Sequence, residues 1–415
     1  MNTAALTLDR GPRPAPLPTD RYVVDASVIR SLPARQQPGW AEHPRLGEVT
    51  TALRAAPPLV EWDTVEALRA CLADAARGTA LVVQAGDCAE DPAESQLHDA
   101  VHKAGVVQSA ANALQRATGR PVVRVGRIGG QFAKPRSADV ERHSDGTELP
   151  VYRGHVVNGP EATLEARTHD PERLLAAHRA AADLQEHITR ICPGATEPIG
   201  RGHHLWTSHE ALVLDYELPQ VHDGPRGHYL ASTHWPWVGN RTNAPDEAHV
   251  AFLASIANPV AVKVGPQVGV EDVLALAERL DPEREPGRLT LISRMGAHQV
   301  DDKLPPLMAA VQAAGHPVLW LSDPMHGNTV TTASGRKTRH LTAIIAEARG
   351  FVDACRRLGI APGGLHLEVA AGDVAECSSD PDFVPADGRY TSLCDPRLNL
   401  DQALLVISAF ARLVR

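Results

Sequence analysis

The fold is decided by residues 260–321, where three short β-rich runs alternate with two helical patterns. The runs are VAVKV (260–264), LTLIS (289–293) and PVLWL (317–321), and the helical patterns extend from Val270 to Leu280 and from Leu304 to Ala314. Successive runs begin about 28 residues apart, a spacing typical of βα units. This part of the chain therefore predicts parallel strands connected by helices.

Further runs extend this rhythm in both directions, at residues 81–84, 121–125, 205–207, 233–238 and 365–369. Eight strands alternating with helices predict an α/β fold of the (β/α)8 TIM-barrel type. A doubly wound sheet is the weaker alternative, because no G-x-G-x-x-G follows the first run. Two connections are long, about 80 residues after the second run and about 48 after the seventh. In a barrel these are the second and seventh βα loops, which lie on the catalytic face.

Residues 1–75 are expected to form an extension that precedes the barrel. The first 20 or so residues are rich in Pro and Ala and are expected to be loose. Residues 21–75 read as helical, with an amphipathic helix from Trp62 to Leu72. We expect the catalytic barrel to occupy residues 76–415.

The composition excludes several classes of protein. No window approaches 18 uninterrupted apolar residues, and the amino terminus lacks the apolar core of a secretory signal. A net charge of −9 argues against a protein that binds nucleic-acid phosphates over a broad surface. The six cysteines include no C-x-x-C pair and are too sparse for a disulfide scaffold. We therefore expect a reduced, cytoplasmic enzyme with no membrane or nucleic-acid partner.

One set of polar residues near the ends of the predicted strands has the chemistry of a metal site. Cys88 follows the first run, His326 follows the seventh, Glu368 lies on the eighth and Asp395 lies in a late loop. A thiolate, an imidazole and two carboxylates would suit Mn, Fe, Co or Zn more than Mg or Ca. The alternative is structural, with a hydrogen-bonding histidine and an ion-paired barrel glutamate.

A second set is cationic and comprises Arg127, Arg241, Lys263 and Arg294, with Lys134 and Arg136 nearby. Lys263 lies inside an apolar run, where a buried cation is costly without an anionic partner. Several cations directed at one pocket favour the binding of phosphate and carboxylate groups. Salt bridges to neighbouring carboxylates are the alternative.

Lysine is rare in this chain, which adds weight to two of these positions. Only five of the 41 basic residues are lysines: Lys103, Lys134, Lys263, Lys303 and Lys337. A lysine kept in an Arg-rich chain suggests a site that needs one compact charge or a proton donor. Lys134 and Lys263 are the two that fall in the cationic set.

Eight segments together resemble the type II (plant and microbial) 3-deoxy-D-arabino-heptulosonate 7-phosphate (DAHP) synthases. The resemblance runs in collinear order from about residue 40 to residue 400. It is carried by QAGDCAE (84–90), RIGGQFAKPRS (127–137), WTSHEALVLDYE (206–217), VKVGP (262–266), SRMG (293–296), DPMHGN (323–328), LEV (367–369) and CDPRLN (394–399).

The resemblance implies a metal-dependent transferase that condenses phosphoenolpyruvate with erythrose 4-phosphate and releases phosphate. This reaction is the first step of the shikimate pathway. The family implies Mn or Co at Cys88, His326, Glu368 and Asp395. The bound metal would polarise the aldehyde carbonyl. We also expect a homo-oligomer, a dimer or larger.

The resemblance also assigns residues to the two substrates. Arg127, Arg241, Lys263 and Arg294 would bind phosphoenolpyruvate, with Asn240 beside it, and Lys134, Arg136 and Ser137 would bind the aldose phosphate. C3 of phosphoenolpyruvate attacks the aldehyde, water adds at C2 and phosphate leaves. Glu210 and Lys134 are the candidates for activating the water.

The sequence departs from the family pattern at two positions. Residues 239–242 read Gly-Asn-Arg-Thr where the family usually has Gly-Glu-Arg-Thr, and residues 152–155 read Tyr-Arg-Gly-His where it has Tyr-Arg-Gly-Asp. Both changes remove negative charge, so a synthase for a modified aldose phosphate, such as an amino analogue, is an alternative. The amino terminus and the second βα loop look shorter than in long, feedback-regulated members. A feedback-insensitive enzyme of specialised metabolism is therefore expected.

Two rivals belong to other classes. A metal-dependent barrel hydrolase is disfavoured because the first strand carries no H-x-H and the pocket has an excess of cations. A catalytically altered or inactive homologue is disfavoured by the four retained metal-site residues, although Asn240 keeps it open.

Overall fold

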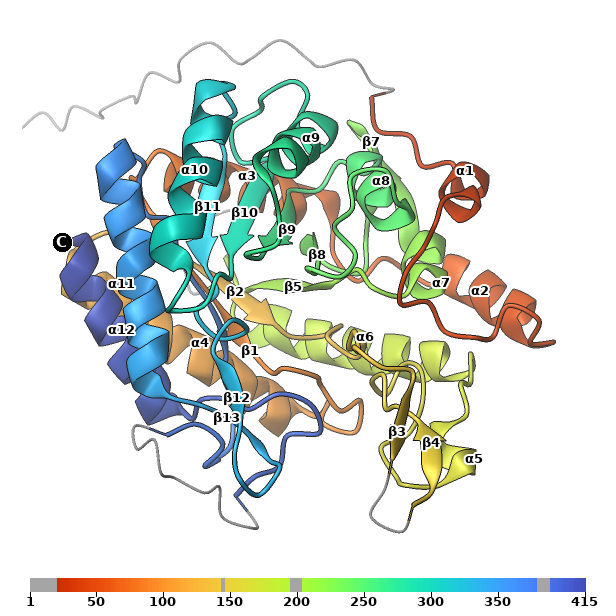
Figure 1. Cartoon of the computed structure of the whole chain (residues 1–415). Helices are drawn as coiled ribbons and strands as arrows, with labels where there is room; N and C mark the ends of the chain where they lie inside the picture. The colour runs from red at the N-terminus through yellow and green to blue at the C-terminus, as the bar shows by residue number, and fades with distance from the viewer. Residues whose placement is uncertain (1–20, 143–145, 195–203, 379–388) are drawn as a thin grey trace, which may run out of the picture.

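The computed structural model describes residues 21–142, 146–194, 204–378 and 389–415, and in this part of the chain eight parallel strands close into a barrel (Figure 1). The predicted (β/α)8 barrel is confirmed, and each predicted run overlaps one barrel strand. Around the barrel the strands follow chain order: β1 (Leu81–Gly86), β2 (Val122–Arg127), β5 (Trp206–Glu210), β8 (Trp235–Val238), β9 (Val260–Val264), β10 (Leu289–Ser293), β11 (Leu319–Ser322) and β14 (Gly364–Glu368).

Helices cover the outside of the barrel, so its strands are buried on both faces and read as nearly continuous apolar runs. The covering helices are α4 (Leu97–Thr118), α6 (Arg173–Ile191), α8 (Ala248–Ala254), α9 (Val270–Leu280), α10 (Val300–Ala313), α11 (Leu341–Leu358) and α12 (Leu400–Val414). Local signals set their ends: Gly119 adopts φ +71° after α4, and Asn399 caps α12 by accepting from the Gln402 N–H.

The connection from β5 to β8 lacks a full-length helix. It carries the short helix α7 (Leu214–Glu217), a 3-10 turn (Leu218–Gln220) and a hairpin of β6 (Val221–Gly224) and β7 (Gly227–Leu230). Asn258 stabilises this hairpin by accepting the Leu230 N–H and donating to the Leu230 carbonyl.

Three helices precede the barrel: α1 (Ala26–Ser31), α2 (Leu46–Arg54) and α3 (Trp62–Ala76). The predicted helix at Trp62 begins where expected and ends four residues later than Leu72. Its Leu68 and Leu72 pack with Val82 and Val123 from the starts of β1 and β2, so α3 closes the amino end of the barrel. The first 20 residues, expected to be loose, lie outside the described residues.

Both long βα loops predicted from the sequence are present and contain hairpins. The loop after β2 carries β3 (Val140–Arg142), β4 (Glu148–Pro150) and the short helix α5 (Leu164–Arg167) before α6. The loop after β11 carries β12 (Thr329–Thr331) and β13 (Lys337–Arg339). Figure 1 shows the two hairpins on the same side of the barrel. Among the described helices, none has both the length and the apolar character needed to cross a membrane.

Candidate active site

A cavity of about 360 Å³ opens at the carboxyl ends of the barrel strands, between the two long loops. All of the predicted substrate-binding residues line it: Arg127, Lys134, Arg136, Ser137, Asn240, Arg241, Lys263 and Arg294. Glu210, His326 and Asp395 line it as well. Glu368 is fully buried at the end of β14, and Cys88 is buried after β1. The fold thus gathers residues from distant parts of the sequence into one region.

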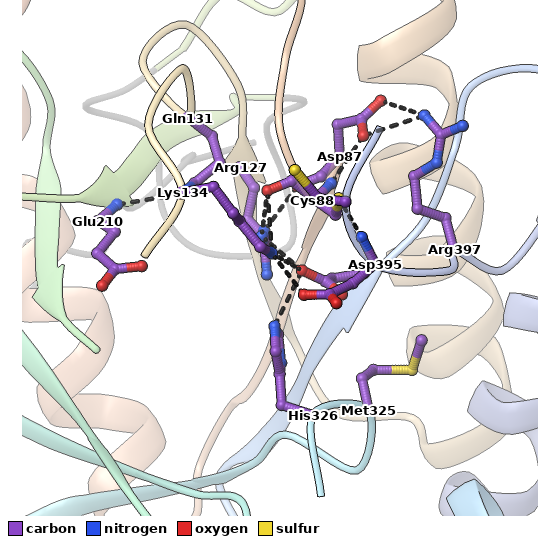
Figure 2. Close-up of polar contacts among 12 residues, drawn as sticks. Asp87, Cys88, Arg127, Gln131, Lys134, Glu210, Met325, His326, Asp395 and Arg397 are labelled. Carbon is purple, nitrogen blue, oxygen red and sulfur yellow. Dashed lines mark hydrogen bonds and ion pairs between the residues drawn. The ribbon is translucent and has the colours of Figure 1, made fainter. Parts of the chain in front are cut away.

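Three of the four predicted metal ligands form one donor cluster. Donor atoms of His326, Glu368 and Asp395 all lie within 4.8 Å of one another. Cys88 lies outside that set but is adjacent, since its sulfur accepts the Asp395 N–H at 3.4 Å. An imidazole and two carboxylates, with a thiol alongside, fit a first-row divalent ion. Figure 2 shows His326, Asp395 and Lys134 converging on one point.

Asp323 orients the imidazole of His326. Nδ1 of His326 lies 2.7 Å from Oδ2 of Asp323, while Nε2 lies 3.0 Å from Oε1 of Glu368. Although burial opposes ionisation, His326 and Lys263 hold the pKa of Asp323 well below its usual range. A carboxylate that fixes the other nitrogen of a metal-binding histidine is a common feature of metal sites. Asp323 stands in the motif at 323–328, but its role beside His326 was not predicted from the sequence.

The Glu368 carboxylate forms ion pairs with several buried cations beside the cavity. Its carboxylate lies 3.1 Å from both Arg127 and Lys134 and 2.6 Å from the fully buried Arg339. Burial acts to raise the pKa of Glu368, but His326 and these cations hold it well below its usual range. A buried carboxylate tolerates ionisation only with such partners. The salt-bridge alternative is therefore correct for part of the cationic set.

The Asp395 carboxylate also has two cationic partners. Its oxygens lie 3.1 Å from Nζ of Lys134 and 2.9 Å from Nζ of Lys337, which projects from β13. Burial acts to raise the pKa of Asp395, but Lys134, Arg339 and His326 together lower it below its usual range. The neighbouring Cys394 thiol likewise lowers the pKa of Cys88. All of these donors are thus biased toward the deprotonated form that binds metal.

Other cations are not neutralised in this way. Within the described part of the chain, no carboxylate lies within 4.0 Å of Arg241 or Arg294; Arg241 donates to Ser137 at 2.6 Å and Arg294 donates to the carbonyl of His326. Lys263 pairs with Asp323 at 2.9 Å, yet burial lowers the pKa of Lys263 to about 8. A bound anion would compensate the positive charge of Arg241, Arg294 and Lys263.

A series of hydrogen-bonded side chains inside the barrel fixes the position of Arg127. His366 is fully buried, and burial with the nearby Lys263 and Arg127 puts its pKa well below the usual range. The neutral ring accepts from Arg127 at 2.7 Å through Nε2 and donates to Gln84 at 2.7 Å through Nδ1. Gln84 in turn donates to Ser208 at 3.0 Å. These bonds fix the guanidinium of Arg127 at the cavity.

Glu210 is one of the carboxylates in the wall of the cavity. Among the described atoms its Oε1 has no hydrogen-bond partner, and a side chain at Gly239 would place Cβ only 2.2 Å from that oxygen. Burial raises the pKa of Glu210. The adjacent Asn240 accepts the Gly265 N–H at 2.9 Å. His155, the other position at which the sequence departs from the family pattern, is not among the described residues that line the cavity.

Two buried ion pairs that the sequence analysis missed support the loops of the site. Lys103 bonds Glu90 at 3.3 Å, and Glu90 accepts the N–H groups of Gly129, Gly130 and Gln131, which precede Lys134. Arg397 contacts both oxygens of Asp87 and so ties the Asp395 loop to the Cys88 loop (Figure 2). The sequence signals for them were the scarcity of lysine, which marked Lys103, and the motifs at 84–90 and 394–399, which contain Asp87, Glu90 and Arg397.

The comparisons with known proteins agree on one family. The sequence model described as "Class-II DAHP synthetase family" matches residues 24–200 and 194–411. A protein of Pseudomonas fluorescens, a probable phospho-2-dehydro-3-deoxyheptonate aldolase, is 50% identical over 383 residues, which cover 91% of this chain and 94% of that protein.

More distant relatives carry the same name. The phospho-2-dehydro-3-deoxyheptonate aldolases of Streptomyces coelicolor and Mycolicibacterium smegmatis are each 38% identical to this chain. The alignments cover 93% and 100% of this chain, and 96% and 99% of those proteins, respectively. A solved structure of a phospho-2-dehydro-3-deoxyheptonate aldolase from Francisella tularensis is similar with a TM-score of 0.55, covering 88% of this chain and 96% of that one. At 14% identity it supports the barrel fold alone.

Proposed function

The chain belongs to the class-II DAHP synthetase family, and from that premise we propose that it is a DAHP synthase. This transferase joins phosphoenolpyruvate, erythrose 4-phosphate and water to give DAHP and phosphate, the first step of the shikimate pathway. One observation carries the proposal beyond family membership. His326 and Asp395 of the three-donor cluster line a cavity of about 360 Å³ together with Arg241 and Arg294, which have no carboxylate within 4.0 Å in the described part of the chain.

The donor cluster supports metal dependence. His326, Glu368 and Asp395 would hold a divalent ion, with Cys88 as the fourth ligand. The mixture of nitrogen, oxygen and sulfur donors favours Mn or Co, with Zn or Fe as alternatives. A bound ion would supply Lewis acidity toward the aldehyde oxygen.

The cations position the two anionic substrates. Arg127, Arg241, Lys263 and Arg294 would bind the phosphate and carboxylate of phosphoenolpyruvate, while Lys134, Arg136 and Ser137 would bind the aldose phosphate and its reacting end. Since both substrates are anions, neutralising their repulsion and aligning C3 with the aldehyde carbon are the main contributions of these side chains.

Glu210 is our candidate for the base that activates water at C2. Its Oε1 is free of hydrogen bonds among the described atoms, and burial raises its pKa toward the range useful for proton transfer. Lys134, the other candidate, already bonds Glu368 and Asp395 at 3.1 Å. Glu210 would accept a proton from the water as its oxygen bonds to C2, and phosphate then leaves from that carbon.

The direct test is a substrate panel. Phosphoenolpyruvate consumption is followed with erythrose 4-phosphate and other aldose phosphates, with and without a chelator, and the product is identified by mass spectrometry. We expect DAHP to form only with metal present. Lys263→Met should lower kcat/KM for phosphoenolpyruvate about 10²-fold, whereas the exposed Lys303→Met on α10 is the matched control. No consumption with any aldose phosphate would end the synthase proposal.

A modified aldose phosphate remains the second candidate substrate. Asn240 supports it, because a neutral amide stands in the cavity wall where the family usually has a carboxylate. An amino sugar phosphate consumed faster than erythrose 4-phosphate in the same panel would favour this alternative.

We also propose that the enzyme is cytoplasmic and homo-oligomeric, and that it escapes feedback inhibition and serves specialised metabolism. The alignment with the Mycolicibacterium relative spans 471 positions against the 415 residues here, so that relative has segments with no counterpart in this sequence. Strong inhibition by Trp, Phe or Tyr would contradict escape from feedback, and sedimentation analysis measures the oligomer.

A further inference from the structure

Glu347 is a fully buried carboxylate on α11 that lies behind the cavity and does not line it. Its Oε1 accepts the Gly296 N–H at 2.9 Å, and its Oε2 accepts from the side-chain amide of Asn328 at 2.7 Å. Gly296 belongs to the loop after β10 and Asn328 to the loop after β11. One carboxylate therefore bonds two neighbouring active-site loops at once.

Asn328 completes the link between the loops. Its side-chain oxygen accepts the Ala297 N–H at 2.9 Å, and its side-chain nitrogen also donates to the Pro324 carbonyl at 2.9 Å. The loops are in close backbone contact, since a side chain at Gly327 would place Cβ 2.3 Å from the Gly296 nitrogen. With so little free space, the relative position of the loops depends on these few bonds.

The chemistry of Glu347 is unusual for a structural residue. Within the described part of the chain no cation lies within 4.0 Å of its carboxylate, and its hydrogen-bond partners there are neutral N–H groups. Burial raises the pKa of Glu347 to about 8. Burying a carboxylate without a counterion costs stability. A glutamine of the same shape would avoid that cost but offers only one acceptor oxygen. In the structure each oxygen of Glu347 accepts from a different loop, an arrangement that the single acceptor oxygen of a glutamine could satisfy for one loop only.

The two loops carry different halves of the site. Arg294, in the loop after β10, belongs to the cationic set that lines the cavity. His326, in the loop after β11, belongs to the donor cluster. The only side-chain bond between these two residues runs from the Arg294 guanidinium to the His326 carbonyl at 2.9 Å. We propose that Glu347, acting through Asn328, is a positioning residue that sets the anion site and the metal site at a fixed distance. This inference rests on the proposed function.

The test exchanges the acceptor and the donor between the two positions. In Glu347→Gln the new NH2 group can face the NH2 group of Asn328, and in Asn328→Asp two carboxylates face each other. The paired variant Glu347→Gln with Asn328→Asp restores a donor opposite an acceptor between these two positions and keeps the original net charge, although the Pro324 carbonyl loses its donor in both variants that carry Asn328→Asp. Glu271→Gln, an exposed position on α9, is the matched control.

The readouts are the Kd for Mn²⁺ of the full chain, measured by electron paramagnetic resonance, and the KM values for both substrates. Each single variant should weaken Mn²⁺ binding about 10- to 100-fold, the range found for residues that support metal ligands. The KM for phosphoenolpyruvate should rise with it, while the KM for the aldose phosphate stays within about threefold, and the paired variant should bind Mn²⁺ more tightly than either single variant.

A lowered melting temperature with unchanged Kd and KM values would show that Glu347 is merely structural and overturn the inference. So would a paired variant no better than both single variants. The Mn²⁺ measurement needs no turnover, so it separates this inference from the synthase proposal. Wild-type protein that binds Mn²⁺ but makes no DAHP would defeat only the latter.

Discussion

The two ends of the barrel are built from the same strands but have opposite chemistry. On β9, Ala261 lies in the apolar cluster at the amino end, and Lys263, two residues later, pairs with Asp323 at the mouth. On β2, Val125 belongs to that apolar cluster and Arg127 to the charged site. Alternate residues of a strand face the same side. On each of these two strands, a residue of the apolar cluster is therefore followed two positions later by a residue of the charged site.

Because the amino end is apolar and the mouth is charged, the two ends are expected to contribute differently to stability and to turnover. The amino end is closed by α3, whose Leu72 is fully buried among aliphatic and aromatic side chains. The mouth buries charges, and these need partners or a bound ligand to be tolerated. We therefore expect substitutions at the mouth to affect turnover first and substitutions at the amino end to affect unfolding first. The following variants test this, in decreasing order of their effect on turnover.

Glu368→Gln should have the largest effect. It removes a carboxylate of the donor cluster and the shared partner of Arg127, Lys134 and Arg339. Since a Lewis acid contributes several kcal/mol, kcat/KM should fall about 10³-fold or more. Steady-state phosphoenolpyruvate consumption measures the loss. A variant that keeps a tenth of the wild-type rate at saturating Mn²⁺ would contradict the role of Glu368 at the centre of the site.

Lys263→Met should rank second. Lys263 is a buried cation in the cavity wall, and its loss leaves Asp323 with one cationic neighbour fewer. We expect kcat/KM for phosphoenolpyruvate to fall about 10²-fold, a typical loss for one electrostatic group. Lys303→Met, on the exposed face of α10, should stay at wild-type level. Equal effects of the two variants would remove the distinction between mouth and surface.

Asp323→Asn should act through the metal. The amide keeps the shape of the side chain but cannot stabilise His326 with a full negative charge, although Nδ1 lies only 2.7 Å away. Metal affinity should fall about 10- to 100-fold, and kcat should recover at high Mn²⁺. Titration of activity against Mn²⁺ tests this. A loss of kcat that no Mn²⁺ concentration restores would point to a different role.

Leu72→Ala should have the smallest effect on turnover and a large effect on stability. The truncation leaves a cavity at the closed end of the barrel and should cost about 2–5 kcal/mol of unfolding free energy. Kinetic constants of the folded protein should match the wild type. Denaturant unfolding and kinetics on the same sample measure both quantities. A changed KM with unchanged stability would show that the two ends are coupled.

The sequence was sufficient for the barrel and for most of the candidate site. Parallel strands leave a strong apolar signal, and polar residues that follow them meet at one end of a barrel, which is why Arg127, Lys263 and His326 could be placed together from sequence alone. Their assigned roles remain predictions.

The supporting residues could not be found in this way. Asp323 and Glu347 act through neighbours set by loop packing, and Arg339 reaches Glu368 from a hairpin inside a long loop. No spacing rule links such positions. Lysine scarcity did carry information: Lys103, Lys134, Lys263 and Lys337 all form ion pairs in or beside the site, whereas Lys303 is exposed.

We infer that the mouth of this barrel is one metal-dependent site for two phosphorylated substrates. The most direct test is phosphoenolpyruvate consumption with erythrose 4-phosphate by chelator-treated protein, before and after Mn²⁺ is added back. We predict no consumption before the addition, and stoichiometric DAHP and phosphate after it. Equal rates in both samples, or phosphate release without condensation to DAHP, would contradict the claim.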